Sequence, residues 1–129
     1  MANTKDPSWS ALVIDDDAGV RNSLRLCLES DGARVLGVGT ASGAFEALER
    51  SSFDAVFLDL WLGRDSGLEV LPEILRRQPS TGVIVITAFA SFETAVQAMK
   101  LGAVDYLPKL PPHRFRLRTG KLRDANVRP

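Results

Sequence analysis

Residues 12–19 read LVIDDDAG, an apolar run that ends in three consecutive carboxylates, Asp15, Asp16 and Asp17. An apolar run of this kind is typical of a buried strand, so the three acids are expected at the carboxyl end of that strand. Two like charges about 4 Å apart in a surface-like dielectric repel each other by about 4 kcal/mol. A folded cluster of acids therefore needs solvent or a cation, and the rest of the chain decides which.

Five short segments rich in Val, Ile and Leu recur along the chain, and stretches with helical period separate them. Parallel strands need crossover connections, so this alternation predicts a doubly wound α/β domain with helices on both faces of a parallel sheet. The predicted strands are residues 11–14, 33–38, 55–58, 83–86 and 103–107. The predicted helical stripes are Val20, Leu24, Cys27 and Leu28; Phe45 and Leu48; Leu68, Leu71 and Leu75; and Ala95, Val96, Met99 and Leu101, with Gly102 as a C-cap glycine.

The chain has 129 residues, of which 45% are hydrophobic and 25% charged, which suits a single domain. We assign residues 1–9 to a flexible tail, 10–124 to the domain and 125–129 to a tail or linker. No apolar run approaches the roughly 20 residues that span a bilayer, and the first ten residues lack a secretory signal, so we expect a cytoplasmic protein. The single cysteine, Cys27, excludes an internal disulfide and is expected in the core.

Complementary groups follow the other predicted strands. Asp59 ends the third strand, Thr87 and Ala88 end the fourth, and Lys109 follows the fifth. Ligands of an open α/β sheet bind at the carboxyl ends of its strands. Carboxylates from adjacent strands suit Mg²⁺, whereas a hydroxyl and an ammonium suit the oxygens of a transferred phosphoryl group. One carboxylate then remains as a nucleophile.

Four segments in this order resemble the CheY-like receiver domain of bacterial two-component response regulators: LVIDDD (12–17), FLDLWLGRDSGLEVL (57–71), VIVITAF (83–89) and AVDYLPK (103–109). The resemblance covers nearly all of residues 10–109. It implies a flavodoxin-like sheet with strand order 2-1-3-4-5. Residues 59–71 and 87–109 look most like receivers of the NtrC-type, sigma-54-dependent transcription activators.

The resemblance also implies residue roles. Asp59 would be the phosphoacceptor, taking the phosphoryl group from a phosphohistidine of a sensor histidine kinase. Asp16, Asp59 and the backbone carbonyl of Trp61 would bind Mg²⁺ directly, while Asp15 would act through metal-bound water. The domain would thus be a signalling module and not a classical enzyme, although it would assist its own phosphoryl transfer and slow dephosphorylation.

The same resemblance implies a conformational switch. Lys109 would pair with a phosphoryl oxygen, and Thr87 would move inward to donate its hydroxyl, assisted by the Ala88 N–H. The Tyr106 ring would rotate into the vacated space and change the nearby surface. Such domains control an output domain, here transcription, and we expect a homodimer on phosphorylation and no membrane partner.

Three residues near the acids have structural roles in this interpretation. Asp17 is predicted to be the N-cap of a helix that starts near Ala18, and not a metal ligand. Gly63 and Gly67 are predicted to give the permissive backbone that a tight turn after Asp59 needs.

The chain departs from the family pattern after Lys109, where Leu110 stands in place of the usual proline. Residues 109–129 hold seven of the sixteen Lys and Arg residues and one of the sixteen acids. We interpret this basic segment as a solvated helix face or the start of a linker, with Gly120 interrupting the helix, and not as a nucleic-acid site. His113 is expected to be exposed.

Two alternatives stay open at this point. A phosphatase of the haloacid dehalogenase type would use Asp15 as nucleophile and Asp17 as general acid, but Ala-Gly follows Asp17 instead of Gly-Thr. A flavodoxin-like cofactor protein would need a phosphate-cradling loop after the first strand, where three aspartates would repel the ligand.

Overall fold

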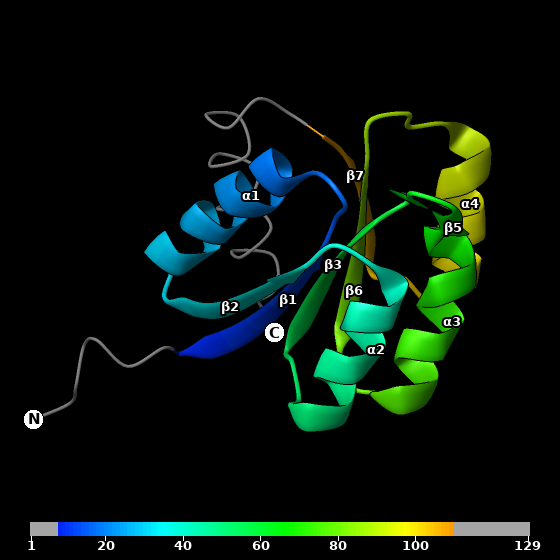
Figure 1. The fold of residues 1–129 in the computed structure, drawn as a ribbon. Helices are drawn as coiled ribbons and strands as arrows, with labels where there is room; N and C mark the ends of the chain where they lie inside the picture. Colours follow the sequence, from blue (N-terminus) through cyan, green and yellow to red (C-terminus); the bar gives the residue numbers. More distant parts are fainter. Residues whose placement is uncertain (1–7, 110–129) are drawn as a thin grey trace, which may run out of the picture.

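The structure, a computed structural model, describes residues 8–109. Its strands are β1 (Trp9–Ile14), β2 (Ala33–Val38), β3 (Ala55–Asp59), β4 (Trp61–Leu62), β5 (Asp65–Ser66), β6 (Gly82–Thr87) and β7 (Asp105–Pro108). Its helices are α1 (Ala18–Ser30), α2 (Ala41–Arg50), α3 (Gly67–Arg77) and α4 (Phe92–Lys100). Five parallel strands form one sheet in the order β2-β1-β3-β6-β7 (Figure 1). Counted among themselves, these strands have the order 2-1-3-4-5, so the predicted fold class is confirmed.

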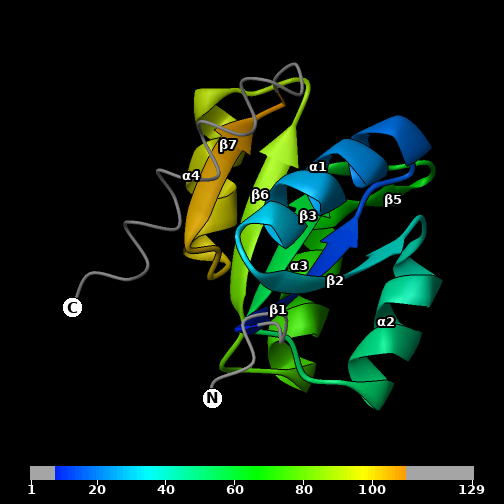
Figure 2. The same ribbon diagram turned by 90° about the vertical axis from the view of Figure 1, so that its left-hand side faces the viewer.

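The core lies on both faces of the sheet, because strands buried on both sides bring apolar residues to each. On one face α1 packs through Leu24, Cys27 and Leu28. Helices α2, α3 and α4 cover the other face, where Leu48 and Leu71 are among the buried residues (Figures 1 and 2). Cys27 is a free thiol in the core, as predicted.

Two predicted helix ends are confirmed. The Asp17 carboxylate accepts hydrogen bonds from the N–H groups of Gly19 and Val20, and α1 begins at Ala18. Gly102 follows α4 with φ of 109°, and its N–H donates to the Met99 carbonyl. The Ala103 N–H donates to Ala98, completing a Schellman motif.

Several details differ from the sequence predictions. The last strand begins at Asp105 and not at residue 103, because the Ala103 N–H is used by the end of α4. The segment after Asp59 is not a plain loop, since β4 and β5 pair antiparallel. The predicted stripe of α4 is wrong in part: Ala98 is the buried residue of this helix, whereas Met99 is 48% exposed. Helix α4 packs against β7, the edge strand of the sheet, and against α3.

The predicted helix after Lys109, the basic segment, His113 and the tail at 125–129 lie outside the described residues. Strand β1 begins at Trp9, within the segment assigned to the N-terminal tail. Among residues 8–109, no helix has the length and apolar character that a membrane crossing requires.

Candidate functional site

The carboxyl ends of four neighbouring strands bring the predicted site residues to one edge of the sheet. Asp15 directly follows β1, Asp59 is the last residue of β3, and Thr87 is the last residue of β6. Lys109 follows β7, and its N–H continues the ladder by donating to the Thr87 carbonyl at 2.8 Å. Strands β1 and β3 pair directly, so two acids that are far apart in the sequence become neighbours.

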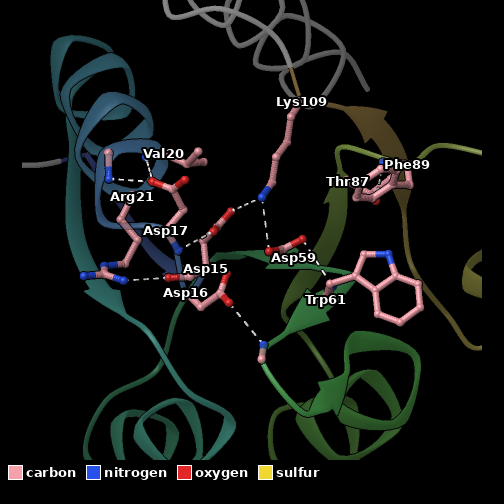
Figure 3. Close-up of polar contacts among 12 residues, drawn as sticks. Asp15, Asp16, Asp17, Val20, Arg21, Asp59, Trp61, Thr87, Phe89 and Lys109 are labelled. Carbon is pink, nitrogen blue, oxygen red and sulfur yellow. Dashed lines mark hydrogen bonds and ion pairs between the residues drawn. The ribbon is translucent and has the colours of Figure 1, made fainter.

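The Lys109 side chain lies between the two buried acids (Figure 3). Its Nζ atom is 2.9 Å from Asp15 Oδ2 and 3.1 Å from Asp59 Oδ2. Asp15 and Asp59 are 0% and 2% exposed, respectively. Buried carboxylates without a counter-charge would be strongly disfavoured, so this ammonium stabilises the ionised pair.

Backbone N–H groups orient the same acids (Figure 3). The Asp17 N–H donates to Asp15 Oδ1 at 2.9 Å, and the Trp61 N–H donates to Asp59 Oδ1 at 3.2 Å. Asp16 is exposed, and its Oδ2 accepts the Gly63 N–H at 3.1 Å. The site thus joins the loop after β1 to the hairpin after β3.

The negative charge of the acids exceeds the positive charge of Lys109 at this site. Burial and, to a lesser extent, the charge of Asp15 raise the pKa of the Asp59 carboxyl to about 6, against the opposing effects of the Trp61 N–H and Lys109. Burial alone would lower the pKa of the Lys109 ammonium, but its contacts with Asp15 and Asp59 outweigh burial and raise it. One ammonium therefore compensates the acids only in part.

A hard divalent cation fits these residues. Asp15, Asp16 and Asp59 each offer a carboxylate oxygen, and these oxygens lie within 4.8 Å of one another. Carboxylates are the protein ligands that Mg²⁺ and Ca²⁺ prefer. A cation here would also offset the repulsion between Asp15 and Asp59. The acids that the sequence predicted as a metal site are thus brought together, while Asp17 caps α1.

The raised pKa of Asp59 predicts a pH dependence of stability. Its folded value of about 6 lies above the ordinary 3.8, so the folded state holds a proton that the unfolded chain releases between these values. The protonated Asp59 carboxyl therefore contributes to the free energy of unfolding below about pH 4. This contribution, of the order of 2–3 kcal/mol, is lost as the pH rises through 6. With a chelator present, the melting temperature of Asp59→Asn minus that of wild type should therefore increase from pH 4.5 to pH 7.5. A difference that stays constant across this range would contradict the assignment.

Thr87 and Tyr106 occupy separate contacts beside the acids. Thr87 is fully buried, and its Oγ1 accepts a hydrogen bond from the Phe89 N–H at 3.1 Å. The half-buried Tyr106 hydroxyl shares a hydrogen bond with Thr94 Oγ1 and accepts the Ser91 N–H at 3.1 Å. Tyr106 thus ties β7 to the start of α4. Ala88, the other predicted phosphate-binding residue, is exposed.

The two glycines after Asp59 have different reasons to be glycine. Gly63 has φ of 60°, a conformation that side chains disfavour, and open space around it. Gly67 packs against the end of β3, where a Cβ would lie 2.4 Å from the Asp59 carbonyl oxygen. The prediction of a permissive backbone therefore holds for Gly63. At residue 67 glycine is needed because the close approach to β3 leaves no room for a Cβ.

Sequence reasoning missed Arg21, whose Nη1 donates to the Asp15 carbonyl at 2.7 Å. It also missed Ser91 and Thr94 as partners of Tyr106. Asp17 and Arg21 are four residues apart, a spacing typical of a side-chain ion pair at a helix start, but the guanidinium instead donates to the Asp15 carbonyl in the loop before α1. No pattern in the sequence marks Ser91 or Thr94.

Comparison with known proteins agrees with this geometry. The profile of the response regulator receiver domain matches residues 11–118. The chain is 39% identical over 122 residues to the alginate biosynthesis transcriptional regulatory protein AlgB of Pseudomonas aeruginosa, covering 94% of this chain and 27% of that protein. It thus spans about a quarter of the length of the AlgB relatives that it matches.

Two solved structures are similar in fold and sequence. The receiver domain of NtrX from Brucella abortus has a TM-score of 0.76 and 32% identity, covering 86% of this chain and 95% of that one. A response regulator from Burkholderia pseudomallei, solved with a phosphorylated aspartic acid, a calcium ion and citrate, has a TM-score of 0.77 and 30% identity. That match covers 93% of this chain and 74% of the other.

Proposed function

The chain belongs to the family of response regulator receiver domains, and from this membership we propose that Asp59 is its phosphoacceptor. Membership sets aside the haloacid dehalogenase and flavodoxin-like alternatives, and it makes the domain a signalling module and not a classical enzyme. The single observation that carries the proposal is the position of Asp59. It is a nearly buried carboxylate at the end of a central strand, beside two further acids and an ammonium.

In the proposed reaction an Asp59 oxygen attacks the phosphorus of a phosphohistidine on a sensor histidine kinase. The P–O bond forms as the P–N bond breaks, and the imidazole leaves with the electron pair. Asp59 is held for this role by the Trp61 N–H on Oδ1 and by Lys109 on Oδ2. As Asp59 becomes an acyl phosphate, the ammonium of Lys109 is free to pair with a phosphoryl oxygen instead.

The proposed cofactor is Mg²⁺, which the carboxylates of Asp16 and Asp59 and the backbone carbonyl of Trp61 would hold directly, with Asp15 acting through water. The calcium ion in the Burkholderia pseudomallei regulator supports a divalent cation in this family. When bound, the cation supplies positive charge to the acids and to the phosphoryl oxygens. Asp15 also forms an ion pair with Lys109, so this acid would position the ammonium as well as contribute to the metal site.

The proposed switch uses Thr87, the Ala88 N–H and Tyr106. The Thr87 hydroxyl has only the adjacent Phe89 N–H as a donor to it among the described contacts, so its own proton can turn to a phosphoryl oxygen. The Tyr106 hydroxyl is hydrogen-bonded to Ser91 and Thr94, so a movement of its ring would change contacts at the start of α4. Slow self-dephosphorylation would end the signal.

The output is proposed from the relatives, of which this chain matches only a part. AlgB is described as a transcriptional regulatory protein, so we infer that the domain, residues 10–124, controls an attached transcription module. The NtrX match supports kinship with NtrC-type activators. The proposal includes a cytoplasmic location, a sensor histidine kinase as phosphodonor and a homodimer on phosphorylation.

The test is to incubate the protein with Mg²⁺ and acetyl phosphate and to map the modified residue by mass spectrometry after reduction with borohydride. We expect modification at Asp59 that is lost in a chelator. Modification at Asp15, or no modification at all, would reject Asp59 as the phosphoacceptor of this chain.

Lys109→Ala is expected to slow the labelling by about 10-fold or more, because it removes the cation that faces both buried acids. The rate of acetyl phosphate labelling measures the effect. Lys100→Ala is the matched control, since Lys100 is an exposed lysine at the end of α4. Equal labelling rates for the two variants would show that the ammonium near Asp59 does not assist transfer.

A further inference from the structure

Arg21 connects helix α1 to the loop that carries the acids. It lies in the first turn of α1, where its backbone N–H donates to the Asp17 carbonyl at 3.0 Å. Its side chain runs back beyond the helix start, and Nη1 donates to the Asp15 carbonyl at 2.7 Å (Figure 3). Among residues 8–109, no carboxylate lies within ion-pair distance of this guanidinium. A backbone carbonyl is thus its principal partner.

The N–H, the carbonyl and Oδ1 of Asp15 each have a hydrogen-bond partner, and Arg21 supplies the partner of the carbonyl. The Asp15 N–H donates to the Val38 carbonyl at 3.1 Å. Its Oδ1 accepts from the Asp17 N–H, and its Oδ2 faces Lys109. The residue is fully buried, so an unpaired carbonyl there would be costly. Arg21 therefore holds the backbone of Asp15 in place.

The hydrogen bond from Arg21 to the Asp15 carbonyl also restricts the backbone of Asp16. The Asp15 carbonyl and the Asp16 N–H belong to one planar peptide unit, so fixing the carbonyl fixes the rotation of that unit. On its other side, Asp16 is held by the Gly63 N–H. The directions in which the two neighbouring carboxylates leave the backbone thus depend on the guanidinium.

The end of β2 leaves room for this side chain. A Cβ on Gly39 would lie 2.9 Å from Arg21 Nη1, and one on Gly37 would lie 3.5 Å from Arg21 Cδ. Positive φ among the described glycines is confined to Gly32, Gly63 and Gly102, so backbone conformation does not require glycine at residue 39. A side chain at residue 39 would instead compete with the guanidinium of Arg21 for the same space.

We propose that Arg21 is a positioning residue, which orients the peptide unit between Asp15 and Asp16 and thereby raises the affinity of the acid cluster for Mg²⁺. Residues that orient metal ligands through a hydrogen bond commonly change metal affinity by about 10- to 100-fold when they are replaced. The metal part of this inference rests on the proposed function. The orientation of the peptide unit does not, and it can be measured without metal.

Calorimetric titration with Mg²⁺ tests the metal part. Arg21→Met removes the donors at similar length and should weaken Mg²⁺ binding about 10-fold. Arg21→Lys keeps a donor and should recover part of the loss. Arg25→Met is the matched control, because Arg25 lies one turn further along α1 and contacts Asn22 and Glu29. Equal affinity in Arg21→Met and wild type would overturn the inference, as would equal losses in Arg21→Met and Arg25→Met.

Amide NMR signals of the metal-free protein test the orientation. Arg21→Met should shift the signals of Asp16 and Asp17 and speed their hydrogen exchange, while Arg25→Met should leave them unchanged. If wild type binds no Mg²⁺, the proposed function fails, and these signals still decide the role of Arg21. Unshifted signals in Arg21→Met would overturn that role.

Gly39→Ala is a second variant that leaves Arg21 in the sequence. The added methyl should displace the guanidinium, shift the same two amide signals and weaken Mg²⁺ binding in the same direction. Its effect should largely vanish in an Arg21→Met background, because both changes break one contact. Additive effects of the two substitutions would overturn the inference.

Discussion

Asp59→Asn is expected to reduce acetyl phosphate labelling to background. The amide keeps the size and position of the side chain, but it lacks the anionic oxygen that attacks phosphorus and donates no negative charge to a cation. Because the free energy of unfolding should not fall, loss of labelling cannot be ascribed to a misfolded domain. Mass spectrometry of the labelled protein and a thermal melt of the same sample measure both quantities.

Asp17→Asn is the matched control for this result. Asp17 stands two residues from Asp15, and its carboxylate caps α1 through the N–H groups of Gly19 and Val20. Asparagine caps helices about as well as aspartate, so the variant should fold and take up most of the label. Equal loss of labelling in the two variants would show that the acids are wrongly assigned. Labelling that persists in Asp59→Asn would reject Asp59 as the acceptor.

Gly67→Ala is expected to destabilise the protein by about 3 kcal/mol or more, which corresponds to a fall in melting temperature of about 10 °C or more. The added Cβ would meet backbone atoms, at 2.4 Å from the Asp59 carbonyl oxygen and 2.9 Å from Leu60 Cα. Neither atom can move without shifting the end of β3 or the start of α3. Because β3 carries Asp59, acetyl phosphate labelling should fall as well.

Gly63→Ala separates the effect of space from that of backbone conformation. Gly63 has φ of 60° and no heavy atom near its added Cβ, so only the conformational cost of about 1 kcal/mol is expected. Thermal melts of the two variants should therefore differ clearly. A similar fall in both would mean that α3 moves away from β3 at little cost.

The fold class was predictable from the sequence alone, and so was the set of polar residues that would meet at the carboxyl edge of the sheet. Buried parallel strands need unbroken apolar runs, so the five strands could be read directly, and polar residues that end such runs must meet at one edge of the sheet. The N-cap at Asp17 and the C-cap at Gly102 were predictable for a similar reason, since each depends on residues within one turn.

The contact partners of these residues depend on tertiary packing and were not predictable. The exposure of Met99 depends on how α4 lies over the edge of the sheet, and the need for glycine at residue 67 depends on the carbonyl of a residue in another element. The contact of Arg21 with the Asp15 carbonyl likewise depends on the space beside Gly39. Apolar periodicity reports which face of an element is buried. It carries no information about which atoms, distant along the chain, the packing brings within a few ångströms of each other.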